Sequence, residues 1–401
     1  MRIGPDNLSD VFFQLNWTSD AIRHTDGYAA RQVNFWRDLL PRRLKDRLEG
    51  LQPGDGFTMD FAPGEIFVDK RKPELRDLSR RQFAPERIGA PALQPRMGRF
   101  YPKGLLKDMT GIFRANITPF RCVACNNGHI TVDMDHPLAD RPLSLTVTVG
   151  GLSPKRTEKG GGMQDWMALL TDGVGMQAPW RDQPTDFFEP ADFVRADETP
   201  DPLFYQKPRM VQHLDDQALE VVRELYGRFV RPGMRVLDLM AAWDSHLPPE
   251  VALKQVTGIG LNDYELSRNK ALTDFRVNDL NADSTLALPD NSYDVAICTA
   301  SVEYLTSPLA VMNEVARVLA PGGRFIVTFS NRWFPPKAIA LWSRLHEFER
   351  MGLVLEYFRR TPAFQDLQTY SIRGLERPSH DKYYGRYWLS DPVYAVWGRK
   401  A

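Results

Sequence analysis

The stretch VLDLMAAWDSHLP at residues 236–248 decides how the C-terminal half of this chain is interpreted. Its first four residues have the pattern of a buried strand that ends in a carboxylate beside a ligand. The next four, Met240-Ala241-Ala242-Trp243, lack the glycines that tight ligand-binding loops normally use. Glycine serves such loops because it tolerates positive φ and lets a ligand approach the backbone. The surrounding sequence must therefore decide whether a binding site follows this strand.

Strands and helices alternate from about residue 206 to the end of the chain. Apolar runs separated by Pro-Gly and Gly-Gly turns predict parallel strands, and apolar residues three or four apart predict helices between them. This order predicts an α/β fold with helices on both faces of a mostly parallel sheet. The expected strands are 234–239, 256–261, 292–299, 324–330, a short one ending near 279, and an antiparallel pair at 366–372 and 393–400; the expected helices are 215–229 and 307–319.

Polar residues stand at four of these strand ends: Asp238, Asn262, Asp279 and the Thr299–Ser301 turn. In an open parallel sheet, ligands bind in the crevice beyond the carboxyl ends of the strands. Each residue alone has a simpler explanation, such as a turn cap or a solvated loop. Four along one edge favour a ligand site.

Several motifs in this half carry a family resemblance. In chain order they are VLDL (236–239), GIGLN (258–262), DLN (279–281), LPDNSYDVAICTASVEYL (288–305) and EVARVLAPGGRFIVTFSNR (314–332). Together they resemble class I S-adenosylmethionine-dependent methyltransferases of the type 11 group, and within it a subgroup whose first motif reads DLM-small-small-W. The resemblance covers about 206–400. It implies a Rossmann-like domain with a seven-stranded, mostly parallel sheet, S-adenosyl-L-methionine as cofactor, and methyl transfer.

The resemblance also implies which residues hold the cofactor. The first loop would receive the methionine part, the end of the second strand the ribose, the third strand end the adenine, and the fourth the methyl-donor side. The residues so assigned are Asp238, Leu239, Met240, Ala241, Trp243, Asn262, Asp279, Leu280, Thr299, Ala300 and Ser301.

Two positions depart from the family pattern. The glycine-rich loop is replaced by Met240–Trp243, and Gly260 stands where an acidic residue is expected to hold the ribose hydroxyls. Asn262 or Asp263, two or three residues later, could take over that contact, because an amide also bonds a hydroxyl.

Catalytic candidates follow the same strand ends. A general base is needed only if the acceptor must lose a proton, because much of the rate of methyl transfer comes from positioning. His246 has an equally good alternative as a loop histidine that bonds backbone, and Glu303 as the start of a helix. His213 either lies over the site or caps the following helix. The candidates are Glu303, Tyr304, His246, Asp244 and Asn331.

The N-terminal half has a resemblance of its own. Residues 39–65 (LLPRRLKDRLEGLQPGDGFTMDFAPGE) and 130–149 (ITVDMDHPLADRPLSLTVTV) resemble FKBP-type peptidyl-prolyl isomerases of the SlyD branch. This implies a mainly-β, α+β domain at 1–152 with a helix at 39–51 and an inserted flap at about 68–115. Phe67 replaces a pocket tyrosine and Asp140 a glycine, so isomerase activity is doubtful. The expected apolar pocket consists of Phe35, Trp36, Phe61 and Leu145.

Residues 153–205 are rich in proline and acid, and we interpret them as a linker or an extended wrap before the domain at 206–401. The spacing Cys122-x-x-Cys125 occurs in metal sites. Cysteines three apart on a strand point to opposite faces, however, so we expect no metal site here. Three cysteines in all suit a reducing cytoplasm.

Composition narrows the function. Lys plus Arg equals Asp plus Glu at 51 each, so nucleic acid is not an expected partner. The sequence has no apolar run near the ~20 residues that span a bilayer and no signal-like N-terminus, so we expect a cytoplasmic protein without a membrane partner.

The primary hypothesis is a methyltransferase for an unidentified small-molecule or polypeptide acceptor, which the N-terminal domain presents or covers. The alternative is a polypeptide-binding, chaperone-like or prolyl-isomerase protein whose methyltransferase domain is a non-catalytic scaffold. Oligomeric state stays open.

Overall fold

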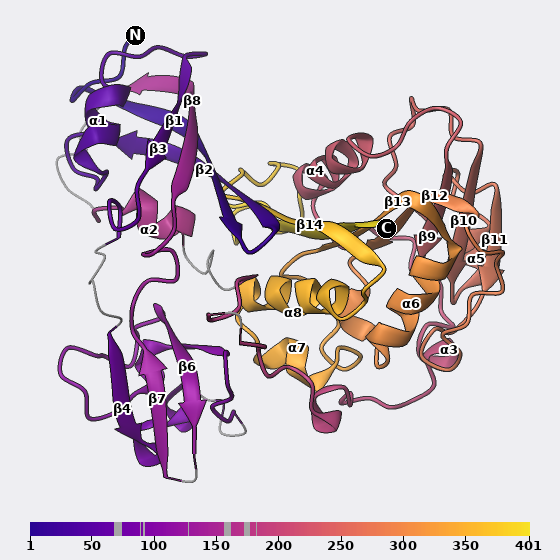
Figure 1. Ribbon diagram of the computed structural model, residues 1–401. Coiled ribbons are helices and arrows are strands. Elements are labelled where there is room, and N and C mark those ends of the chain that lie inside the picture. The colour runs from indigo at the N-terminus through magenta and orange to yellow at the C-terminus, as the bar shows by residue number, and fades with distance from the viewer. Residues whose placement is uncertain are drawn as a thin grey trace. The chain divides into compact units, whose positions relative to one another are not determined.

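The computed structural model forms two compact units (Figure 1). The first comprises Met1–Glu189 and Arg344–Gly352, and the second Pro190–Ser343 and Leu353–Ala401. The division after Glu189 falls inside the expected linker, 153–205. The structure describes residues 1–67, 74–88, 90, 93–126, 128–155, 162–171, 177–181 and 183–401.

The second unit contains seven strands in the order β11-β10-β9-β12-β13-β15-β14. The neighbours from β11 to β13 pair in parallel, and β15 is antiparallel to both β13 and β14. The predicted seven-stranded, mostly parallel sheet is therefore confirmed. The bounds are β9 Arg235–Leu239, β10 Gln255–Gly260, β11 Asp274–Val277, β12 Tyr293–Thr299, β13 Leu319–Phe329, β14 Phe364–Arg373 and β15 Val393–Lys400.

Helices cover this sheet on both faces, with α4 (Asp216–Gly227) on one side and α6 (Pro308–Val318) on the other (Figure 1). α4 begins where Asp215 accepts a hydrogen bond from the Ala218 backbone N–H. Pro308 opens α6, where a missing N–H costs nothing. The other helices of this unit are α3 Asp201–Phe204 and α5 Asp263–Leu266, and the residues of α7 Ala340–Arg344 and α8 Glu347–Arg359 are divided between the two units.

The first unit contains an antiparallel sheet in the order β2-β1-β8-β3. Alternate residues of these strands point inward and pack against the buried leucines of α1, Leu44 and Leu48. The expected helix at 39–51 is confirmed but shorter, because Pro41 precedes it and Gly50 has a positive φ of 83°. The bounds are β1 Asn7–Ser19, β2 Ile22–Asn34, β3 Gly56–Phe61, β8 Leu143–Pro154, α1 Arg42–Leu48 and α2 Trp166–Thr171.

A second sheet of this unit, β4-β7-β6-β5, has its own core around Phe120, Cys122 and Val132. It extends from Leu75 to Asp133, well past the expected flap at 68–115, of which 68–73, 89 and 91–92 lie outside the described residues. The bounds are β4 Leu75–Ser79, β5 Phe100–Pro102, β6 Pro119–Cys125 and β7 His129–Asp133. Short 3-10 helices lie at Arg80–Gln82, Pro85–Ile88, Lys103–Leu105, Pro190–Asp192 and Val302–Tyr304.

The apolar pocket expected from the SlyD-like motifs is not formed by the residues proposed for it. Phe35, Phe61 and Leu145 are buried in the core, and Trp36 is 64% exposed. Phe67 stacks on His136 with 3.6 Å between ring centroids. The SlyD resemblance itself stays a prediction.

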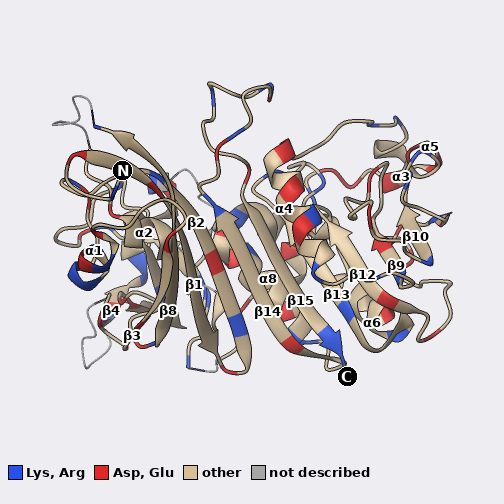
Figure 2. Ribbon diagram, turned by 90° about the horizontal axis from the view of Figure 1, so that it is seen from above, with Lys and Arg blue, Asp and Glu red and all other residues tan. Residues whose placement is uncertain are grey.

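Charge is mixed throughout the molecule: Figure 2 shows basic and acidic residues interspersed along the ribbons of both units. Among the described residues, no helix is long and apolar enough to cross a membrane. Within the same ranges, no group of three or more His, Cys, Asp or Glu side chains is placed to hold a metal ion.

A buried ion pair in the first unit gives a stability prediction. The Arg99 Nε lies 2.5 Å from the Glu349 Oε1, and both side chains are almost fully buried. Glu349→Gln leaves the guanidinium buried without its counter-charge, and removing one partner of such a pair costs about 3–5 kcal/mol. We expect the urea midpoint of the full chain to fall clearly.

The double variant Arg99→Met/Glu349→Leu leaves no buried charge at this position and should recover much of that loss. A Glu349→Gln protein as stable as the wild type would contradict a structural role for the pair.

Candidate functional site

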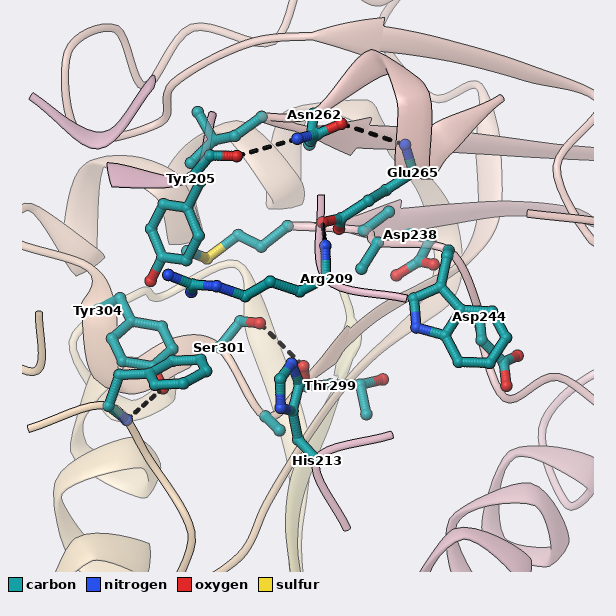
Figure 3. Close-up of a pocket in the computed structure, with 18 of the residues that line it drawn as sticks. Tyr205, Arg209, His213, Asp238, Asp244, Asn262, Glu265, Thr299, Ser301 and Tyr304 are labelled. Carbon is teal, nitrogen blue, oxygen red and sulfur yellow. Dashed lines mark hydrogen bonds between the residues drawn. The ribbon is translucent and has the colours of Figure 1, made fainter. Parts of the chain in front are cut away.

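A cavity of about 160 Å³ lies in the second unit, at the carboxyl ends of β9, β10, β11 and β12 (Figure 3). This is the edge at which the sequence placed a ligand site. Leu239 does not line this cavity; it is buried and lines a separate, smaller apolar cavity. The other cofactor candidates all line the cavity at the strand ends: Asp238, Met240, Ala241, Trp243, Asn262, Asp279, Leu280, Thr299, Ala300 and Ser301.

Asp238 is a buried carboxylate at the end of β9, only 2% exposed. Burial raises its pKa to about 7, although a hydrogen bond from Ser245 acts in the opposite direction. Within the described part of the chain, its Oδ2 is buried and has no hydrogen-bond partner. A buried acceptor of this kind is costly unless something pairs with it. Asp238 therefore suits a cationic group of a ligand.

The loop after β9 is built without glycine. Met240 takes the left-handed backbone conformation, with φ of 56°, at a cost of roughly 1–2 kcal/mol for a residue with a side chain. The Ala241 N–H donates to the Ile259 carbonyl at 2.8 Å, and the Asn269 amide donates to the Ala242 carbonyl and the Ser245 hydroxyl, both at 2.9 Å. These contacts hold the strained residue in place, and strain of this kind concentrates at functional sites.

The same loop explains why β10 ends in glycine. A Cβ on Gly260 would lie 2.2 Å from the Ala241 carbonyl oxygen, far inside van der Waals contact. No side chain fits there, so the expected strand-end acid is excluded by the loop that replaces the glycine-rich turn. The two departures seen in the sequence are thus one structural feature.

Further along the loop, Asp244 is paired with His246. The His246 Nδ1 lies 3.1 Å from the Asp244 Oδ2, and the Gln212 amide donates to the same oxygen at 2.8 Å. Burial alone would raise the pKa of Asp244, but the hydrogen bonds from His246 and Gln212 outweigh it and lower the pKa. Asp244 is therefore an anion that orients its neighbours.

The segment preceding α4 forms a further wall of the cavity. The Trp243 indole N–H donates to the Val211 carbonyl at 3.2 Å, so the ring is tied to this wall. Arg209 packs its guanidinium 4.8 Å from the Phe204 ring centroid and 4.9 Å from that of Phe334. His213 lines the same side of the cavity.

The catalytic candidates divide into two groups. Tyr304, His246 and Asp244 line the cavity, whereas Glu303 and Asn331 do not. Burial, and then the charge of Glu303, raises the pKa of Tyr304 well above its ordinary value, so its phenol stays protonated. Sequence reasoning did not select Tyr205, Arg209 and Glu265, which also line the cavity. They stand between motifs, where no local pattern marks them.

Residues 242–327 match a family model described as a methyltransferase domain. The matched range begins inside the altered loop and ends in β13, so the second unit carries a methyltransferase domain over that range. A comparison with curated proteins found none that matches this chain.

Solved structures of similar arrangement include several methyltransferases. One is an S-adenosylmethionine-dependent methyltransferase from Mesorhizobium loti, 16% identical, with a TM-score of 0.32 over 46% of this chain and 99% of that one. Another is the YcgJ protein of Bacillus subtilis, 16% identical, with a TM-score of 0.32 over 46% and 98%. A third is a methyltransferase candidate in complex with the Trm112 activator of Haloferax volcanii, 18% identical, with a TM-score of 0.36 over 46% and 90%. None of these likenesses decides a substrate, a partner or a reaction for this chain.

The contact at Gly260 can be tested by adding a single methyl group. Gly260→Ala drives a Cβ into the Ala241 carbonyl, and overpacking of this kind costs about 1–3 kcal/mol or more. We expect the thermal midpoint of the full chain to fall by several degrees.

Gly227→Ala is the matched control. Gly227 ends α4, and a Cβ there would meet only Pro248 Cγ at 4.0 Å, so the substitution should be neutral or slightly stabilising. Equal thermal midpoints for the two variants would refute the close approach of the loop to β10.

Proposed function

We propose that the second unit binds S-adenosyl-L-methionine in this cavity and transfers its methyl group to an acceptor. The observation that carries the proposal is the buried Asp238 carboxylate, with an oxygen that no described residue pairs, at the carboxyl edge of a sheet of this topology. The cofactor's methionine part offers an ammonium and its reacting centre a sulfonium, both cations. A buried carboxylate is favourable only when such a charge pairs with it. The methyltransferase match at residues 242–327 supports the same assignment.

When bound, the cofactor supplies an electrophilic methyl group; the chain's own residues position the acceptor. His213 is a candidate to take the acceptor's proton. Burial lowers its pKa, and the nearby cations Arg209, Lys382 and Arg332 lower it further, so the imidazole is neutral near pH 7 and able to accept a proton. The Tyr304 hydroxyl accepts from the Phe334 N–H at 2.9 Å and, kept protonated, can donate its own hydrogen to a ligand. This division of roles suits an acceptor that must lose a proton as it is methylated.

The competing function is a non-catalytic scaffold attached to a polypeptide-binding N-terminal unit. Two observations favour it: Met240 is strained where the family has glycine, and the Gly260 position cannot carry a ribose-binding acid. If the second unit is a methyltransferase, we expect the SlyD-like first unit to present or cover its substrate; if it is a scaffold, we expect the first unit to bind polypeptide itself or to isomerise prolyl bonds. Binding of the cofactor separates the two functions.

Calorimetric titration of the full chain with S-adenosylhomocysteine tests the proposal. Repeating the titration from pH 5.5 to pH 8 tests the part that Asp238 plays in it. Asp238 must be ionised to accept the ammonium, and with a pKa near 7 its ionised fraction rises roughly 30-fold from pH 5.5 to pH 8. Affinity should therefore increase with pH by about that factor.

Asp238→Asn is the control, because it removes the carboxylate and leaves the other cavity residues, His213 and His246 among them, unchanged. The variant should bind more weakly and lose most of the pH dependence. No saturable heat at any pH from 5.5 to 8 would leave only the scaffold function.

A further inference from the structure

The cavity spans three neighbouring strands whose order fixes what a long ligand must cross. β10 lies between β9, whose last residue but one is Asp238, and β11, after which Asp279 follows. A ligand that reaches from Asp238 to Asp279 therefore passes over the end of β10. An adenosyl group has its vicinal hydroxyls between its sulfur-bearing arm and its base, so this middle position needs hydrogen-bond acceptors.

The residues nearest the end of β10 cannot supply them. Gly260 admits no side chain because the Ala241 carbonyl occupies that space. The Asn262 amide donates to the carbonyls of Tyr205 at 2.9 Å and Gln206 at 3.2 Å, and its oxygen accepts from the Glu265 N–H at 3.2 Å. Asp263 is exposed and does not line the cavity. Of the two residues suggested as substitutes for the strand-end acid, Asn262 is thus already hydrogen-bonded and Asp263 lies outside the cavity lining.

Glu265, one helical turn further in α5, does line the cavity. Its Oε1 accepts a hydrogen bond from the Arg209 N–H at 2.6 Å, which fixes the direction of the carboxylate (Figure 3). In the described ranges, no hydrogen bond engages its Oε2. A carboxylate has about four acceptor positions, so one bond to Arg209 leaves enough for two hydroxyls.

The other acids of the cavity serve different contacts. Asp201 is paired with Arg195 and Lys337, and Asp244 with His246. Asp279 stands after β11, beyond the middle strand. Among the acids named here, Glu265 alone combines an uncommitted oxygen with a position beside β10.

We propose that Glu265 binds the ribose diol of the adenosyl cofactor in place of the strand-end acid that Gly260 excludes. This inference rests on the proposed function, since it presumes an adenosyl ligand in the cavity. It makes the turn after β10, and not the strand end, the determinant of ribose recognition. A ligand without the 2′-hydroxyl should then bind more weakly, because it cannot donate that hydrogen bond to the Glu265 carboxylate.

The test is calorimetric titration of the full chain with S-adenosylhomocysteine and with its 2′-deoxy analogue. A charge-assisted hydrogen bond makes a difference of about 10- to 100-fold in affinity. The wild type should prefer S-adenosylhomocysteine by a factor in this range. Glu265→Gln, whose remaining oxygen can still accept from the Arg209 N–H, should bind S-adenosylhomocysteine about 10-fold or more weakly and lose most of that preference.

Asp263→Asn is the control variant, because Asp263 lies two residues before Glu265 in α5 but is exposed and does not line the cavity. Retention of the preference by Glu265→Gln, or its loss in Asp263→Asn instead, overturns the assignment while leaving the proposed function intact. A wild type that binds neither ligand overturns the proposed function, and this inference with it. We expect the thermal midpoints of both variants to lie within a few degrees of the wild type. A loss of affinity then reports the lost contact and not unfolding of the variant.

Discussion

The close packing of the Ala241 backbone against the end of β10 is the constraint on which the rest of the site depends. It requires glycine at position 260, because a Cβ there would lie 2.2 Å from the Ala241 carbonyl oxygen. It is secured by the Ala241–Ile259 hydrogen bond and by Asn269, and it accompanies the left-handed backbone at Met240. A loop that places strain next to a cavity must be held by its neighbours, and here Ile259 and Asn269 hold it from outside the cavity lining.

The polar groups around the cavity are placed in accordance with this packing. Asp238 of β9 is buried and has an oxygen that no described residue pairs, whereas β10 ends in Gly260 and Glu265 of α5 lines the cavity beside it. The segment from Tyr205 to His213 is bonded to both turns, through Asn262 and Glu265 on one side and Trp243 and Asp244 on the other. One segment thus contacts both the loop after β9 and the turn after β10.

Much of this could be predicted from sequence, and the failures have physical causes. The seven strands and the helices α4 and α6 were predicted from apolar periodicity and turn signals, whereas the 13-residue helix α8 was not predicted. The polar residues at Asp238, Asn262, Asp279 and Ser301 were found because parallel strands end at one edge. That Gly260 is required by a contact with Ala241 could not be predicted, since it depends on two backbones meeting across strands. Glu265 was missed for a related reason: the direction of its carboxylate is fixed by the Arg209 backbone N–H, 56 residues earlier. In the first unit, the pocket expected at Phe35 and Phe61 is core, because apolar residues alone do not distinguish a pocket from an interior.

A crystal structure of the protein grown with S-adenosylhomocysteine tests the central claim most directly. The account predicts the ligand in the cavity beyond β9 and β10, its amino group on Asp238, its ribose hydroxyls on Glu265, and the Ala241 carbonyl still packed against Gly260. An empty cavity at saturating ligand, or a ligand seated only after the Met240–Trp243 loop has moved away from β10, would contradict it.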